Sequence, residues 1–200
     1  MTDLETGPDG RPMVHPLSRA EWREWLEANQ ERPAGVWLAS YKKAAGKPRM
    51  EYEEVVEELL CFGWIDSTAG TIDAERSLLW CAPRKPRSNW SRPNKVRVER
   101  LQAAGLIAPR GLAVIAAAQA NGTWNALDEV EDLIVPGDLA AALAGRGARE
   151  RWDGMGRSAR RAVLEWLVNA KRPETRARRV AAAAEAALEG KAANEWKPKA

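Results

Sequence analysis

A loop rich in arginine and proline around residues 83–92 is the part of the chain best suited to bind an anion. Its sequence is Pro83-Arg-Lys-Pro-Arg-Ser-Asn-Trp-Ser-Arg92, and its prolines favour an irregular, extended backbone. Guanidinium groups bind phosphate or carboxylate through paired hydrogen bonds, and an indole ring offers a face to a base, a ring or a cation. Pro93 follows, so we expect the loop to end on a helix N-terminus, which itself favours anions. The predicted ligand-binding residues of this anion-binding loop are Arg84, Arg87, Ser88, Trp90, Ser91 and Asn94.

These residues also have a structural interpretation, because a tryptophan before a helix can anchor packing and arginines can cap carbonyl groups.

A second candidate is Asp66, in the apolar segment Gly63-Trp-Ile-Asp66. Burying an unpaired carboxylate is costly, so Asp66 must be hydrogen-bonded or paired. An ion pair with an arginine of the loop would satisfy this need. In the alternative, Asp66, Asp73 and Arg84 line one cleft, with Asp66 as a general base or a ligand of a hard cation. We add Trp64 and Asp66 to the predicted ligand-binding residues and predict no catalytic residue.

A third candidate is the arginine-rich run 172–179, which opens the last predicted helix. Arg172, Arg176 and Arg179 can share one helix face, and such a basic stripe suits phosphate contacts. The sequence shows no zinc finger, no aromatic RNA-recognition motif, no homeodomain pattern and no helix-turn-helix. Nucleic-acid binding is therefore an alternative that we do not favour.

Charge is more segregated than the net charge of +3 suggests. Residues 51–75 hold eight acids and no bases, residues 82–100 hold seven bases and one acid, and residues 146–179 hold eleven bases and four acids. Opposite blocks of this kind either neutralise each other within the fold or leave an anion site. We favour internal neutralisation and solvation for most of these charges.

The residue counts exclude several classes of protein. Cys61 and Cys81 give no disulfide framework and no metal-ligand spacing, so we expect both to be small core residues. The single histidine, His15, makes a histidine-rich metal site or a histidine-based triad hard to build. No apolar run approaches the ~20 residues of a membrane-spanning helix, and the first residues lack the pattern of a secretory signal. We therefore expect a cytoplasmic chain with no metal, no cofactor and no membrane insertion.

The elements that position these residues can be read from apolar periodicity and from caps. Ser18 and Glu21 fit a capping box for a helix over 18–31, and the spacing from Tyr52 to Leu60 indicates a helix over 51–62 with these residues on its buried face. Strands are expected at 35–41, 64–68, 71–73 and 77–82, with a turn at 69–70. Further helices are expected at 92–104, 110–120, 137–144, 148–153, 157–171 and 174–189.

This order predicts an α+β protein that is mainly α-helical, with a small antiparallel sheet in its N-terminal half. The predicted organisation is a flexible tail over 1–16, an α+β region over 17–122, a helical module over 123–190 and a tail over 191–200. Ten tryptophans against one phenylalanine are unusual, and most of them fall on apolar faces where an indole buries a large area. We expect Trp22, Trp25, Trp64 and Trp166 in the core and Trp196 in the exposed tail.

Several blocks of sequence resemble a known bacterial family. They are Leu60-Cys-Phe-Gly-Trp-Ile-Asp66, Ala82-Pro-Arg84, Ser88-Asn-Trp-Ser91 with Asn94, and then Val135-Pro136, Trp152 and Ala170-Lys-Arg-Pro-Glu-Thr-Arg176. Over roughly residues 17–190 the chain resembles the bacteriocin-protection family called YdeI or OmpD-associated, with an OmdA-type helical segment at its C-terminal end. The resemblance implies a link to envelope proteins and to survival of antimicrobial peptides, and it implies no catalytic residue and no cofactor.

From these observations we expect a non-enzymatic binding protein whose partner is a small molecule, a peptide or a protein. The expected site is a cleft between the hairpin that carries Asp66 and the anion-binding loop. The alternatives are a nucleic-acid or nucleotide binder that uses the same loop, and an enzyme that uses Asp66.

Overall fold

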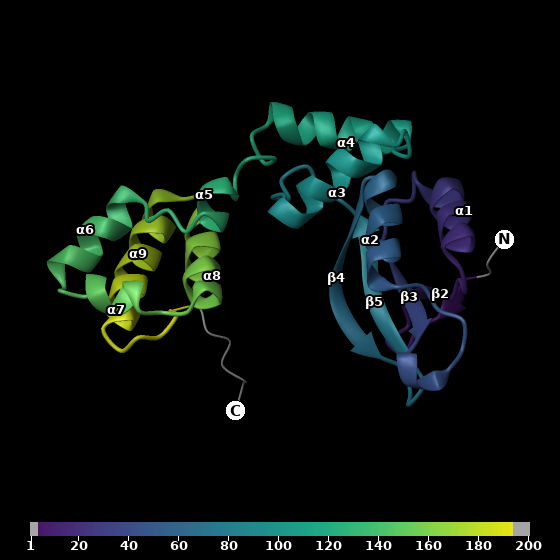
Figure 1. Cartoon of the computed structure of the whole chain (residues 1–200), viewed down its shortest axis with the longest axis horizontal. Helices are drawn as coiled ribbons and strands as arrows, with labels where there is room; N and C mark the ends of the chain where they lie inside the picture. The colour runs from purple at the N-terminus through teal and green to yellow at the C-terminus, as the bar shows by residue number, and fades with distance from the viewer. Residues whose placement is uncertain (1–3, 194–200) are drawn as a thin grey trace. The chain divides into compact units, whose positions relative to one another are not determined.

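The structure is a computed structural model that describes residues 4–193 (Figure 1). These residues form two compact units. The first, here called the N-terminal unit, runs up to Ser88 and continues from Pro93 to Trp124; the second, the helical unit, holds Asn89–Arg92 and the chain from Asn125 onward. The division after Trp124 lies two residues beyond the predicted boundary at 122, and the prediction had placed residues 89–92 in the first region.

The N-terminal unit is built on a five-stranded sheet in the order β1-β2-β3-β5-β4. Its neighbouring strands are antiparallel except for β2 and β3, which are parallel. The parallel pair differs from the predicted antiparallel sheet and arises because helix α1 separates β2 from β3 along the chain. The strands are β1 (Glu5–Thr6), β2 (Pro12–Val14), β3 (Val36–Tyr41), β4 (Trp64–Thr71) and β5 (Arg76–Pro83).

The first two strands correct the prediction of a tail over 1–16. Met13 and Val14 are buried and pair with Trp37 and Leu38 of β3. Strands of two and three residues are too short to show an alternating pattern, and the prolines and glycines around them look like those of a tail. The predicted tail over 191–200 lies mainly outside the described residues, although Ala192 packs in the helical core.

The hairpin of β4 and β5 also differs from the prediction. Residues 64–71 form one strand with a bulge between Asp66 and Ala69, where a strand, a turn and a second strand were expected. The true turn lies at residues 72–75, where the carboxylate of Asp73 accepts hydrogen bonds from the backbone N–H groups of Glu75 at 2.9 Å and Arg76 at 2.7 Å. Aspartate stabilises turns in this way, so Asp73 determines where the chain reverses.

The helical elements up to Ala120 are α1 (Arg19–Asn29), the 3-10 turn η1 (Lys43–Ala45), α2 (Tyr52–Cys61), α3 (Arg92–Ala103) and α4 (Pro109–Ala120). Helix α2 packs against the sheet at β4, and α1 and α4 pack against α2. The predicted cap of α1 is present, because the Ser18 hydroxyl accepts a hydrogen bond from the Glu21 N–H at 3.3 Å. Figure 1 shows α1 and α2 next to each other and α2 beside β4. Trp25 packs between Trp22 and Trp64, with ring centroids 5.3 and 5.9 Å from its own.

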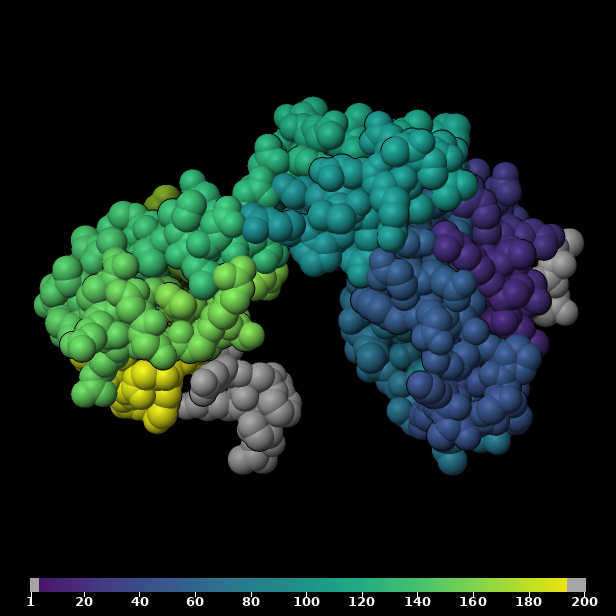
Figure 2. Space-filling model, viewed as in Figure 1, coloured from purple at the N-terminus to yellow at the C-terminus, as the bar shows by residue number. Residues whose placement is uncertain are grey.

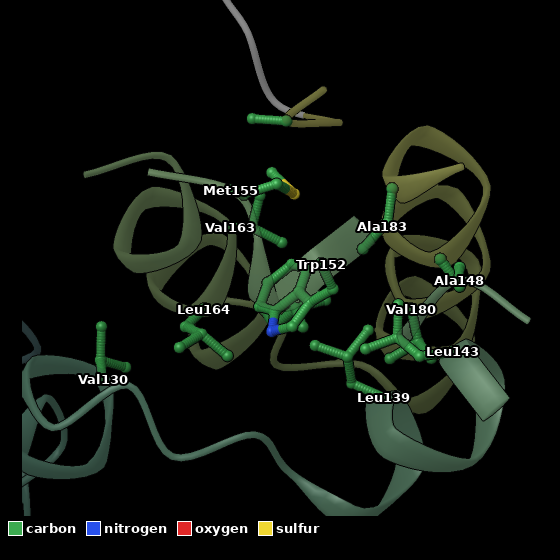
Figure 3. Packing of buried hydrophobic residues seen from close by; sticks show 14 of the residues in the cluster. Val130, Leu139, Leu143, Ala148, Trp152, Met155, Val163, Leu164, Val180 and Ala183 are labelled. Atoms are coloured by element: carbon green, nitrogen blue, oxygen red, sulfur yellow. The ribbon is translucent and has the colours of Figure 1, made fainter. Parts of the chain in front are cut away.

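The helical unit has its own hydrophobic core (Figure 3). Trp152 is 1% exposed, and Figure 3 shows it among the side chains of Val163, Leu164 and Val180. Buried alanines on one face of the last helix allow its backbone to pack closely against its neighbours. The helices are α5 (Asp128–Glu131), α6 (Gly137–Gly145), α7 (Arg149–Asp153), α8 (Arg157–Val168) and α9 (Pro173–Ala187). Sequence analysis predicted four of them and missed α5, which is a single turn.

Candidate functional site

A cavity of about 320 Å³ lies in the N-terminal unit between the sheet and the start of α2. Its walls are formed largely by apolar side chains, including Leu38 of β3, Leu79 of β5, Met50 and Val55. This volume falls at the lower end of the range of small-molecule sites, roughly 300–1,000 Å³. It is therefore large enough for a small organic molecule with an apolar body.

The local fold explains why this part of the sheet is incompletely covered. Helix α2 begins only at Tyr52, and apart from the short turn η1 the chain between β3 and α2 is irregular. Figure 1 shows η1 at the end of the sheet where β4 ends and α2 begins. The chain around residues 40–60, blue in Figure 2, forms surface on the side of this unit that faces the viewer. Arg49 and Met50 of this irregular segment form part of the cavity wall, where a longer helix would pack more closely on the sheet.

Tyr52 lies at the edge of the cavity and connects it to Asp66. The tyrosine is 57% exposed, although its spacing had placed it on the buried face of its helix. Its hydroxyl donates a hydrogen bond of 2.8 Å to the carboxylate of Asp66. Partial burial and the negative carboxylate both disfavour the phenolate, and together they raise the pKa of Tyr52 to about 12. The Tyr52 phenol therefore keeps its proton at neutral pH.

Arg84 is the predicted ligand-binding residue that interacts with Asp66. It is 6% exposed and follows β5, and its backbone N–H donates to the Gly63 carbonyl at 3.0 Å. Burial lowers the pKa of Arg84 to about 10, while the negative charge of Asp66 acts in the opposite direction. Asp66 thus interacts with both a buried guanidinium and a phenol, which agrees with the structural interpretation of this carboxylate.

The other predicted ligand-binding residues have varied surroundings. Trp64 is 0% exposed and Trp90 is 1% exposed, so neither ring presents a face to solvent in this structure. Arg87 is exposed and Ser88 half-buried, while the side-chain oxygen of Asn94 accepts a hydrogen bond of 3.0 Å from Arg97. Trp90 and Ser91 are grouped with the helical unit. Ligand binding at these positions stays a prediction.

Asp73 does not share a cleft with Asp66. Asp66 pairs with Cys81 near the start of β4, whereas Asp73 lies in the turn at the far end of the hairpin. Asp66 and Asp73 are seven residues apart, and a strand of that length spans roughly 20 Å. The Asp73 carboxylate is also paired with Arg76 at 2.9 Å, and this contact helps to hold its pKa below the usual value.

The basic stripe of the last helix is largely engaged within the helical unit. Arg176 makes two hydrogen bonds to the Asp138 carboxylate, at 2.7 and 2.8 Å. Arg179 donates to the backbone carbonyl of Trp166 and lies over its ring, 4.8 Å from the centroid. Arg172 is exposed at the start of α9. A role of this stripe in nucleic-acid binding stays a prediction.

The opposite charge blocks neutralise each other in part, through the pairs of Arg97 and Arg100 with Glu53 and Glu57, and other charges find partners elsewhere. The acids of α2 pair with arginines of α1 and α3, and Glu58, which is 2% exposed, binds both Arg19 and Arg23. In the helical unit, Arg161 pairs with Glu131 and Glu165 at 2.9 Å each. Further pairs are Glu53 with Arg97 and Arg100, Glu57 with Arg19 and Arg100, Arg146 with Glu185, and Arg149 with Asp153.

Over residues 4–193, no group of three or more histidine, cysteine or carboxylate side chains is arranged to hold a metal ion. None of the helices in this range is long and apolar enough to cross a membrane. Cys61 and Cys81 are both free thiols and both buried, as the sequence predicted.

Comparison with known families assigns the two parts of the chain differently. Residues 14–114 match the family described as a domain of unknown function, DUF8412, and the chain belongs to this family. Residues 132–190 match the family described as Bacteriocin-protection, YdeI or OmpD-Associated, which confirms the predicted family resemblance for this segment. The resemblance was expected over 17–190, but the match to that family covers only its C-terminal part. No curated protein and no solved structure matches the chain.

Proposed function

We propose that this chain is a non-enzymatic cytoplasmic binding protein of the YdeI/OmpD-associated type, with the cavity of the N-terminal unit as its ligand site. The observation that carries this proposal is the cavity of about 320 Å³, with apolar walls and polar groups such as Tyr52 among its lining. Such a combination of apolar surface and a few polar groups is typical of small-molecule sites. The site differs from the cleft expected from the sequence, because it lies beside the Tyr52–Asp66 pair and away from the loop after Arg84.

Binding without catalysis is supported by the raised pKa of Tyr52. A general acid or base works best when its pKa lies near the operating pH. The pKa of Tyr52 is raised to about 12, so its phenol holds its proton throughout the neutral range. The phenol donates its one proton to Asp66, so the Tyr52 oxygen can accept a hydrogen bond from a ligand in a fixed arrangement, which recognition of a ligand requires. The cytoplasmic location is supported by the two free thiols, which are typical of a reducing compartment.

A cavity-filling variant tests the ligand site. Ser40→Leu places a branched side chain into the lining, while Ser158→Leu makes the same change at an exposed position of α8 in the helical unit. Small apolar fragments are added to the ¹⁵N-labelled full chain, and the shifts of backbone amide signals are followed. We expect fragments to shift the amides of the lining strands in the parent and in Ser158→Leu, and not in Ser40→Leu. Ser77→Leu repeats the test if Ser40→Leu fails to fold. Absence of any fragment that shifts these amides contradicts the proposal.

The proposed biological role is tolerance of bacteriocins or antimicrobial peptides, and it is supported by the family match of residues 132–190. Cells that lack the gene are complemented with the parent chain, Ser40→Leu or Ser158→Leu, and are exposed to a cationic antimicrobial peptide. If the cavity serves this role, survival is restored by the parent and by Ser158→Leu and is lost with Ser40→Leu. Equal survival of complemented and uncomplemented cells contradicts the role in tolerance and leaves the ligand site standing.

A further inference from the structure

The cavity is lined by two cations and by no carboxylate among its described lining residues. Lys42 follows β3 and Arg49 precedes α2, and both contribute to the wall. The lining tyrosines, Tyr41 and Tyr52, are neutral when protonated, and the pKa of Tyr52 is raised far above neutral pH. A net positive lining in a partly enclosed space favours a negatively charged occupant.

The two cations have donors to spare. The ammonium group of Lys42 donates one hydrogen bond, of 2.7 Å, to a neutral acceptor, the backbone carbonyl of Asp73. An ammonium group carries three donors and a guanidinium group carries five. Arg49 uses one of its donors on Glu51 at 2.6 Å, and the side chain of Glu51 is 68% exposed. Exposed ion pairs contribute little free energy, so Glu51 competes only weakly with an anion inside the cavity.

The nearby carboxylates already have partners of their own. Glu75 pairs with Lys47 at 2.6 Å, and Asp73 pairs with Arg76 at 2.9 Å. Asp66 accepts the Tyr52 hydroxyl. Of the two lining cations, Arg49 pairs with a carboxylate, whereas the ammonium group of Lys42 donates to a neutral backbone carbonyl.

The apolar walls and the volume of the cavity indicate the size and the apolar character of the ligand body. Leu38, Leu79, Met50 and Val55 offer surface to a hydrocarbon or aromatic body. A cavity of about 150 Å³ holds benzene, so a cavity about twice as large holds a body and a head group of about ten non-hydrogen atoms together. We infer that the cavity binds a small monocarboxylate with an apolar body, its carboxylate held by Lys42 and Arg49. This inference rests on the proposed function, since it names the class of ligand for the same site.

The test uses two compounds of the same size that differ in charge, 3-phenylpropanoate and 3-phenylpropanamide. Each is titrated into the ¹⁵N-labelled full chain, and amide shifts report both the location of binding and the dissociation constant. We expect both compounds to shift the amides of Ser40, Gly70 and Ser77, and the acid to bind at least about tenfold tighter, which is about 1.4 kcal/mol. Lys42→Gln should bring the acid to within about twofold of the amide and leave binding of the amide unchanged.

Lys43→Gln is the matched control, because Lys43 is adjacent, exposed and outside the lining. It should retain the preference for the acid, and Arg49→Gln provides a second variant if Lys42→Gln is poorly folded. Equal affinity of acid and amide at the cavity overturns the inference and leaves the proposed function intact. An equal loss in Lys42→Gln and Lys43→Gln also overturns it, because the attraction is then unspecific. If neither compound shifts the cavity amides, the inference fails, and the fragment titration described above decides separately whether the proposed ligand site stands.

Discussion

Replacing Glu58 by glutamine should weaken the N-terminal unit by removing a buried charge that joins α1 to α2. The carboxylate is 2% exposed and accepts hydrogen bonds from Arg19 at 2.6 Å and from Arg23 at 2.8 Å. Glutamine keeps the shape but offers one acceptor oxygen, and its amide turns N–H donors toward a guanidinium group. Arg19 retains a second partner, Glu57, at 2.8 Å. The variant therefore removes one strong contact completely and weakens another.

The size of the expected loss in free energy of unfolding follows from the burial of the Glu58 carboxylate and the partial exposure of Arg19 and Arg23. Removing one member of a buried ion pair costs about 3–5 kcal/mol when the other stays desolvated. The side chains of Arg19 and Arg23 are 35% and 36% exposed, so both can turn toward water. We therefore expect a loss in free energy of unfolding of about 2–3 kcal/mol, below most of that range. Glu53→Gln on the same helix is the matched control, because Glu53 is 48% exposed and its ion pairs should be worth less than about 1 kcal/mol.

The urea midpoints of both variants are measured by hydrogen exchange and mass spectrometry. Because the two units can unfold separately, peptides from α1 and α2 are followed rather than a global signal. With a slope of about 2 kcal/mol per M, Glu58→Gln should lower the urea midpoint of these peptides by about 1 M or more. Glu53→Gln should lower it by less than about half of that. A urea midpoint for Glu58→Gln that is no lower than that of Glu53→Gln refutes the reasoning. Burial of the carboxylate would then have no influence on the free energy that its ion pairs contribute.

Three further outcomes are expected. Asp66→Asn removes the negative acceptor of the Tyr52 hydroxyl, so the pKa of Tyr52 should fall from about 12. Ultraviolet titration of the two tyrosines measures this pKa, and the Tyr52→Phe variant shows which of the two signals belongs to Tyr52. The pKa of Glu131 is held below its ordinary value, mainly by a hydrogen bond from an arginine of α8, so this carboxylate stabilises the helical unit above about pH 4.5 and less as pH falls. Glu131→Gln should flatten the acid side of the stability profile of that unit, and an unchanged profile contradicts this. Gly111→Ala should cost about 1–3 kcal/mol, because a Cβ there would overlap the backbone carbonyl that ends α2. Urea unfolding that matches the parent contradicts the overlap.

The regular helices could be predicted because their signals are local. The Ser18 cap and the spacing from Val55 to Leu60 depend only on residues within a few turns, and both helices begin and end within two residues of the prediction. Elements without a local signal were missed. Strand β2 is three residues long, and its place in the sheet depends on pairing with β3 across helix α1. The turn of the β4–β5 hairpin was misplaced because the Ala69-Gly70 pair looks like a turn, whereas the hydrogen bonds of Asp73 determine the reversal.

The candidate site was predictable only in part. The sequence indicated that Asp66 needs a partner and named an arginine of the loop, and Arg84 does act on it. It did not indicate Tyr52, because helical spacing assigned that residue to the buried face. The missing information is tertiary: Tyr52 is the first residue of α2 and is 57% exposed, so the packing of the neighbouring elements, which spacing does not reveal, decides that it lies beyond the edge of the core. A cavity formed by incomplete coverage of a sheet has no sequence pattern of its own.

The helical unit shows that inherited segments and folding units need not coincide. The stretch that matches the OmpD-associated family runs over 132–190, yet the core of the unit also includes Leu127 and Val130. The unit takes in Asn89–Arg92 as well, through a hydrogen bond from Asn89 to Asn169 and an ion pair between Arg92 and Asp132. A polypeptide cut at the edges of the family match would leave part of this core uncovered. Recombination that moved only the matched stretch into another gene would therefore transfer an incomplete domain, and its new host would have to supply the missing apolar side chains.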